Sequence, residues 1–167
     1  MVSLDLADAV ATVVTALNAN FSAVPVAVNG SDTRGGYTGT KPDIEAVYGE
    51  GGRLRKRRID LDRIPAKSIV FVYEVSDVEN ETTVDEQFAD VNIRVSIDIR
   101  SRISRAKLHE LYNELRRIIM KVRTTIGGNY TYIKRLGKTD LTNKRTGIFR
   151  YVFDVELVKV SDFVGHS

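Results

Sequence analysis

The stretch DVNIRVSIDIRSRISRAKLHELYNELRRIIMKVR, from Asp90 to Arg123, changes its hydrophobic period from two residues to about three and a half. Apolar and polar residues first alternate strictly, which predicts a strand with one buried face and one face in solvent. We expect Asp98 to lie on the solvent face. The apolar residues are Val91, Ile93, Val95, Ile97 and Ile99, and the polar residues are Asn92, Arg94, Ser96, Asp98 and Arg100.

A long helix is predicted directly after this strand. Ser104 is placed to cap its first turn, and an apolar stripe at helical spacing continues from there. The paired glycines Gly127 and Gly128 are expected to end the helix as a C-terminal cap. The stripe consists of Leu108, Leu111, Tyr112, Leu115, Ile118, Ile119, Val122 and Ile126.

The N-terminal segment predicts a second helix, from about residue 4 to about residue 20. Ser3 is its expected N-cap, and its apolar residues recur at helical spacing from Leu6 to Phe21. The polar face holds alanine, threonine and asparagine and few charges, which is typical of a helix packed on more than one side. A core helix is the favoured interpretation, and a helix that faces a partner is the alternative.

The remaining strand-like segments complete the predicted fold. Together with the elements above, they indicate one domain, residues 1–167, of the α+β class. We expect a largely antiparallel β-sheet with two main helices packed on one face, plus a long, partly irregular loop. The further strands are expected at 24–28, at an edge because of its proline, and at 68–77, 129–137 and 148–160, the last two joined by a hairpin.

Residues 29–67 lack long-range periodicity, apart from a short expected strand near Ile44–Tyr48. Long loops in compact domains are frequently binding loops or segments that become ordered on assembly. We therefore interpret this region as an extended binding or assembly loop. Its basic run supplies candidate interface residues, which are Arg53, Arg55, Lys56, Arg57 and Arg58.

The stretch from Ser68 to Ile93 contains no lysine or arginine. Its carboxylates either lie at a solvated hairpin tip or form a docking surface for a basic partner, and both interpretations stay open. The acidic interface candidates are Glu79, Glu81, Asp85 and Glu86. The basic candidates at the expected tip of the last hairpin, residues 138–147, are Lys138, Lys144 and Arg145.

Composition excludes several classes of function. The chain has no cysteine, which rules out thiolate nucleophiles, disulfides and cysteine-based zinc sites. A net charge of +3 gives little support to nucleic acid binding by itself. No apolar run is long enough to span a bilayer, and the N-terminus carries aspartates where a signal peptide carries basic residues. We expect a soluble protein, made in the cytoplasm, with no membrane partner.

The sequence contains no recognisable catalytic constellation. His109 falls on the polar side of its helix, where a solvated surface residue is favoured over a catalytic base. Asp98 and Glu74, on adjacent predicted strands, would suit a magnesium site, but charges that face solvent explain them more simply. We therefore expect a protein that is not an enzyme and that has no catalytic residues, no cofactor and no metal site.

The order of these elements resembles the tail terminator proteins of long-tailed bacteriophages and related archaeal viruses, which are also called tail completion or head-tail joining proteins. The resemblance lies in the opening helix LADAVATVVTALNANF, in VNIRVSIDIRSR running into SRAKLHELYNELRRIIMKV, and in the closing strand YVFDVELVKV. It covers most of the chain apart from residues 29–67. It is a resemblance of architecture, because the family has no sharp sequence motif.

The resemblance implies a structural virion protein of the tail or neck. Such a protein forms a ring, typically hexameric, at the head-proximal end of the tail tube, ends tube polymerisation and joins the tail to the head connector. Its partners would be further copies of itself, the tail tube protein, the connector or neck proteins, and DNA passing through the ring lumen. The separation of basic and acidic segments suits a head-to-tail ring interface.

Two other interpretations stay open. One is another neck or head-completion protein, such as an adaptor or a stopper. The other is a nucleic-acid-binding module, which the basic run at 53–58 favours. That module lacks the interleaved aromatic residues and the motif expected of proteins that bind nucleic acid.

Overall fold

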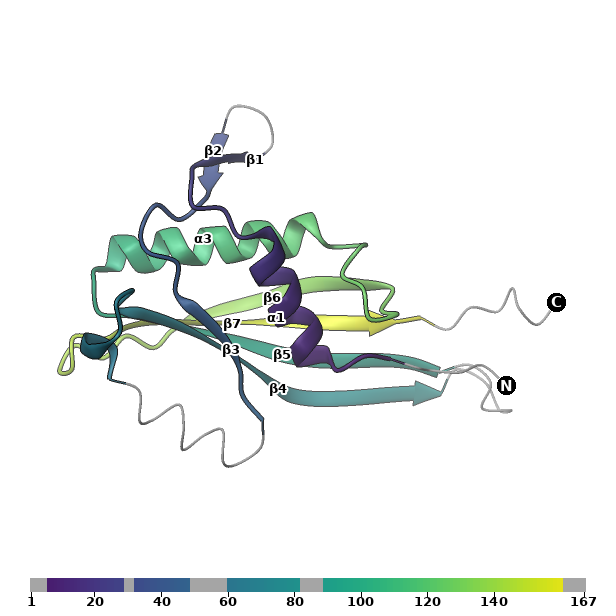
Figure 1. Cartoon of the computed structure of the whole chain (residues 1–167). Helices are drawn as coiled ribbons and strands as arrows, with labels where there is room; N and C mark the ends of the chain where they lie inside the picture. The colour runs from purple at the N-terminus through teal and green to yellow at the C-terminus, as the bar shows by residue number, and fades with distance from the viewer. Residues whose placement is uncertain (1–5, 29–31, 49–59, 82–88, 161–167) are drawn as a thin grey trace.

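A mostly antiparallel five-stranded sheet with two helices on one face forms the body of the molecule, which confirms the predicted α+β class (Figure 1). The computed structural model describes residues 6–28, 32–48, 60–81 and 89–160. In these residues, no helix has the length and apolar character needed to cross a membrane. The sheet order is β3-β4-β5-β7-β6. Its strands are β3 (Asp43–Ala46), β4 (Ser68–Glu81), β5 (Ala89–Ser101), β6 (Tyr132–Asp140) and β7 (Phe149–Lys159).

The strand followed by a helix that the sequence predicts is present as β5 and α3 (Arg105–Lys121). The hydroxyl of Ser104 caps α3 by accepting from the backbone N–H of Lys107 at 3.1 Å. The predicted glycine cap is wrong, because the helix ends at Lys121. Gly127 and Gly128 instead adopt positive φ angles, 89° and 64°, in the connection to β6, a conformation that glycine adopts at low cost.

The first helix, α1 (Ala9–Asn20), is shorter than the sequence predicted. Its N-cap is Asp8, whose carboxylate accepts from the N–H groups of Val10 and Ala11, while the proposed cap Ser3 lies outside the described residues. The N–H of Ala7 donates to the carbonyl of Gly128, and this contact with a distant turn replaces the expected first helical turn. The helix propensities of the residues do not predict this contact.

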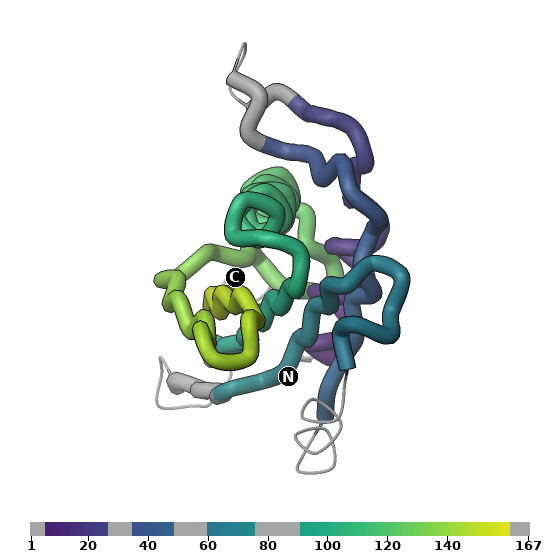
Figure 2. Tube along the Cα trace, turned by 90° about the vertical axis from the view of Figure 1, so that its left-hand side faces the viewer, coloured from purple at the N-terminus to yellow at the C-terminus, as the bar shows by residue number. Residues whose placement is uncertain are grey.

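The region 29–67 is more ordered than expected where the structure describes it. Residues 32–35 form β2 (Asp32–Gly35), which pairs with β1 (Val26–Val28) in a separate two-stranded sheet. We call β1 and β2 the arm, and Figure 1 shows it above α3, away from the main sheet. Figure 2 shows α3 end-on, with β7 of the main sheet below it. Further along, β3 joins the main sheet parallel to β4, and a short 3₁₀ helix, η1 (Leu61–Arg63), precedes β4.

Both faces of the sheet are covered in part. The main core lies between the sheet and the two helices, and it includes the predicted apolar stripe of α3 and Val95, Ile97 and Ile99 of β5. A smaller cluster on the other face consists of Val47, Leu61, Ile69 and Phe71. The prediction that the polar side of β5 faces solvent is therefore wrong at Ser96 and Asp98, which are both buried.

Candidate functional site

The connection between β6 and β7 presents two of the predicted basic candidates, Lys144 and Arg145, which are both exposed. Asn143 fixes the shape of this turn. Its side-chain oxygen accepts from the N–H of Arg145 at 2.9 Å, and its N–H donates to the carbonyl of Ile148 at 3.0 Å. A φ of 69° at Gly147 completes the turn. The two cations therefore lie on an ordered turn at one end of the sheet.

Lys138, the third candidate of this group, is not at the hairpin tip as predicted but within β6. The register between β6 and β7 shifts between Arg135 and Lys138, and this bulge directs the lysine toward the helix side. Its ammonium lies 4.7 Å from the ring centre of Tyr112 and 4.2 Å from that of Tyr151. These distances are typical of cation–π contacts, so Lys138 is partly held by its own chain.

Arginines neutralise the acidic groups near this end of the sheet. Arg105 donates to the carboxylate of Asp140 at 2.6 Å, and this hydrogen bond holds the pKa of Asp140 well below its usual range. Arg102 forms an ion pair with Asp62 at 3.3 Å and also donates to the carbonyl of Thr146 in the turn. Because the nearby carboxylates are paired, Lys144 and Arg145 give this end a net positive surface.

The other predicted interface residues are less well placed for a test. Glu79 and Glu81 occupy the far end of β4, beside the connection to β5, but their side chains are not described. Asp85 and Glu86 lie outside the described residues. The basic run also lies outside them: Arg53, Arg55, Lys56, Arg57 and Arg58.

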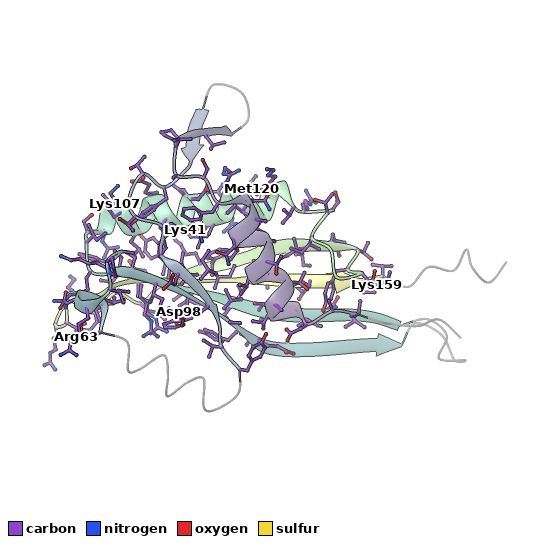
Figure 3. All side chains as sticks on the ribbon, in the orientation of Figure 1. Lys41, Arg63, Asp98, Lys107, Met120 and Lys159 are labelled. Atoms are coloured by element: carbon purple, nitrogen blue, oxygen red, sulfur yellow. The ribbon has the colours of Figure 1, made fainter. Side chains whose placement is uncertain are left out.

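Asp98 is the first polar group whose role the sequence did not predict. It is fully buried on the face of the sheet away from α3 (Figure 3). Arg150, on the adjacent strand β7, donates to both carboxylate oxygens at 2.9 and 2.8 Å, and Arg100 donates to both at 3.3 and 3.2 Å. One carboxylate therefore binds two guanidinium groups. This arrangement argues against the magnesium site that was considered for Asp98 and Glu74.

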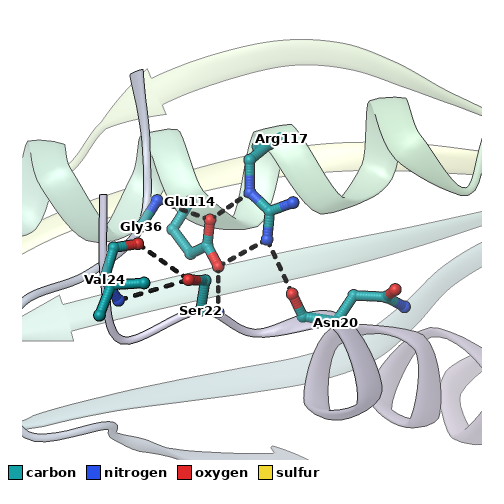
Figure 4. Close-up of polar contacts among 6 residues, drawn as sticks. All are labelled: Asn20, Ser22, Val24, Gly36, Glu114 and Arg117. Atoms are coloured by element: carbon teal, nitrogen blue, oxygen red, sulfur yellow. Dashed lines mark hydrogen bonds and ion pairs between the residues drawn. The ribbon is translucent and has the colours of Figure 1, made fainter. Parts of the chain in front are cut away.

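Glu114 is the second such group, and it lies in the middle of α3 with no exposed surface. Its carboxylate accepts from the N–H of Ser22 at 2.5 Å and from the N–H of Gly36 at 2.8 Å (Figure 4). Arg117 binds the same carboxylate and also donates to the carbonyl of Asn20. Ser22 and Gly36 flank the arm, so one buried ion pair holds both ends of the arm against α3.

Gly36 is required at this point. Its φ is 91°, and a Cβ atom there would collide with the carbonyl oxygen of Val24. A side chain on Gly35 would collide with Arg117. The paired glycines and Glu114 are therefore parts of one arrangement, which sequence reasoning missed because the partners are distant along the chain.

Little in the described residues suggests chemistry. His109 is exposed on α3, as predicted, and its ring lies 6.3 Å from that of Tyr112. Among the described residues, no group of three or more histidines or carboxylates is close enough to hold a metal ion. Comparison of the sequence with protein-family models and with curated proteins finds no significant match. The charged surfaces at the ends and edges of the sheet are thus the best candidates for a functional site.

Proposed function

We propose that the protein is a structural component of a virus particle, which forms a ring at the head-proximal end of a tail tube. In this position it ends polymerisation of the tube and joins the tail to the head connector. The observation that carries the proposal is the continuous unit of β5 and α3 within a helix-backed, mostly antiparallel sheet. This is the architecture on which the resemblance to tail terminator proteins rests.

A tube made of stacked rings continues to grow until a protein covers its open end. A capping subunit must match the last ring on one face and differ on the other, so that no further ring can add. The turn between β6 and β7 suits the matching face, because Asn143 orders it and it presents Lys144 and Arg145 to solvent. An acidic surface on the tube end would complement these cations.

Removal of the gene from the virus that carries it tests the function. We expect filled heads without tails and free tubes of irregular length in electron micrographs of the lysate, with DNA replication and lysis unchanged. Tails of normal length firmly joined to heads would show that the proposal is wrong. Tubes of regular length beside tail-less heads would favour an adaptor or stopper of the neck over a terminator.

The double variant Lys144→Glu/Arg145→Glu tests the proposed docking face. It should fold normally, because exposed substitutions usually change stability by less than about 0.5 kcal/mol. It should also fail to complement the gene deletion. The matched control is Arg63→Glu, which reverses an exposed charge on η1. If the double variant restores tailed particles as well as the control does, the turn is not a docking face.

The exposed cations also favour a second candidate function, binding of nucleic acid. Contacts with phosphates would make the affinity fall steeply as the salt concentration rises. Titration of double-stranded DNA at several salt concentrations measures this slope. A steep slope that Lys144→Glu/Arg145→Glu abolishes would support this candidate function.

A further inference from the structure

A small hollow lies between the last turn of α3 and β6, which is an edge strand of the main sheet. Its volume is about 220 Å³. The residues that line it are either aliphatic or basic: Ile119, Met120, Ile133, Arg123, Lys134 and Arg135. We call it the basic hollow.

The fold itself gives the basic hollow its shape. The N–H of Ile133 donates to the carbonyl of Arg123 at 2.8 Å, and this bond joins β6 to the end of α3. Ile119 and Ile133 are buried and form the floor. Met120 lies on α3 (Figure 3) and is 47% exposed, so it offers an apolar surface to solvent. The hollow is therefore formed before any partner binds.

Most of the charge around the basic hollow is unpaired in the part of the chain that the structure describes. Lys134 forms an ion pair with Glu156 at 3.3 Å. Arg135 donates to the hydroxyl of Tyr112 at 3.1 Å and to a backbone carbonyl, which are both uncharged acceptors. Arg123 is exposed, and no described residue forms an ion pair with it. The rim thus has a net positive charge, which is complementary to carboxylates.

Two simpler roles explain the cations but not the apolar surface between them. Basic side chains on an edge strand hinder its pairing with other strands. Cations also attract phosphates, but surfaces that hold single-stranded nucleic acid usually add aromatic rings on which the bases stack. The apolar residues of the basic hollow are aliphatic, and methionine is a side chain that adapts to an apolar partner.

We propose that the basic hollow binds an acidic peptide segment of a partner protein. One apolar side chain of the segment enters the hollow, and its carboxylates bind Arg123 and Arg135. The size suits a single side chain, since pockets for whole small molecules usually measure about 300–1,000 Å³. An apolar centre within a charged rim is also a common arrangement in protein interfaces.

This inference does not rest on the proposed function. The hollow lies beside the first half of β6, whereas the turn that carries Lys144 and Arg145 follows the other end of that strand. Binding at the hollow is therefore measured separately from docking at the turn.

Fluorescence anisotropy with the purified full-length protein tests the inference. The probe is a fluorescein-labelled peptide with one leucine flanked on both sides by glutamates. Replacing the leucine by serine should weaken binding by about tenfold, because the apolar contact in the hollow is lost. Replacing the glutamates by glutamines should weaken binding by at least about tenfold, because the charge complementarity is lost.

Substitutions in the protein should reproduce these effects. Arg123→Glu and Arg135→Glu should each weaken binding of the leucine peptide by at least about fivefold. Met120→Gln should remove most of the preference for the leucine peptide over the serine peptide and keep the preference for glutamates. The control Lys144→Glu reverses a charge outside the hollow and should bind like the wild type. Circular dichroism establishes that each variant is folded, and either arginine variant suffices if the other is not.

Several results would overturn the inference. They include equal binding of the leucine and serine peptides, and no binding of the leucine peptide up to about 1 mM. Double-stranded DNA that binds more tightly than the leucine peptide, and loses affinity in Arg123→Glu, would identify nucleic acid as the occupant. Self-association in sedimentation velocity that Arg135→Glu abolishes would identify the occupant as a second copy of the chain.

Discussion

Two fully buried carboxylates, Glu114 on α3 and Asp98 on the opposite side of the sheet, bind arginine in different ways. Glu114 binds one guanidinium and two backbone N–H groups, from residues 92 and 78 positions away along the chain. Asp98 binds two guanidiniums, from Arg100 on its own strand and Arg150 on the next. The first carboxylate joins segments of chain that no strand pairing connects, and the second reinforces a pairing already made by backbone hydrogen bonds.

This difference predicts how much each carboxylate contributes to the stability of the fold. Without Glu114, the partly buried N–H of Ser22 and the buried N–H of Gly36 lose their acceptors, and Arg117 loses its counter-ion. Without Asp98, the paired strands β5 and β7 keep their ladder, and both arginines can still reach solvent, being 20% and 29% exposed. We therefore expect loss of Glu114 to be the more damaging change.

The largest effect is expected for Glu114→Ala. Breaking a buried ion pair by removing one partner typically costs about 3–5 kcal/mol, and here two N–H groups are also left without an acceptor. Urea unfolding followed by circular dichroism measures the loss. Glu110→Ala, one turn earlier on the same helix and partly exposed, is the control and should cost less than about 1 kcal/mol. Equal losses for the two variants would contradict the role assigned to Glu114.

Asp98→Ala should have an intermediate effect. We expect a loss of about 2 kcal/mol in the free energy of unfolding, the range for hydrogen bonds to charged groups, because the freed arginines move toward water. Arg100→Met should cost less than Asp98→Ala, since Arg150 continues to bind the carboxylate. The same urea titrations test both variants. A loss for Asp98→Ala larger than that for Glu114→Ala would reverse the comparison.

The smallest expected effect is on the pH dependence of stability. It compares one tyrosine on each side of the sheet. Burial, with the nearby charges of Asp8 and Glu74, raises the pKa of Tyr130 from 10.0 to about 12. Because the folded pKa is the higher one, this contribution to stability is complete below pH 10 and is lost as the pH rises toward 12.

Thermal unfolding between these pH values should show a shallower decline in Tm for Tyr130→Phe than for the wild type. Tyr73 is the comparison on the other side, because burial and then the charge of Asp98 also raise its pKa. Tyr73→Phe should change the slope less. If neither substitution alters the decline of Tm with pH, ionisation of these tyrosines is not the cause of that decline.

The regular elements were the most predictable part of the molecule. The strict alternation in β5 and the apolar stripe of α3 each reflect burial of one face of the element. The spacing of the apolar residues therefore identifies the strand and the helix from the sequence. The boundaries were less predictable where a distant residue decides them. α1 begins at Ala9 after the cap Asp8, and the N–H of Ala7, just before the helix, bonds to the carbonyl of Gly128, a contact that leaves no mark on local sequence.

The candidate site was predicted only in part, for a related reason. Lys144 and Arg145 were placed correctly because turn residues surround them. Lys138 was misplaced because β6 continues to Asp140, past the predicted end of the strand. Asp98 looked like a solvent-facing charge, since its burial depends on Arg150, which is 52 residues away. A predicted register between β5 and β7 would have been needed to find that pair.

The ion pair at Glu114 also has a consequence for the kinetics of local opening. The N–H groups of Ser22 and Gly36 bond to the two oxygens of one carboxylate, so movement of the Glu114 side chain affects both ends of the arm. Their amide hydrogens should therefore exchange with solvent at a common rate, in one cooperative event with the middle of α3. The arm and the helix would then behave as a single unit, and a force applied to the arm would be carried directly into the longest helix of the body.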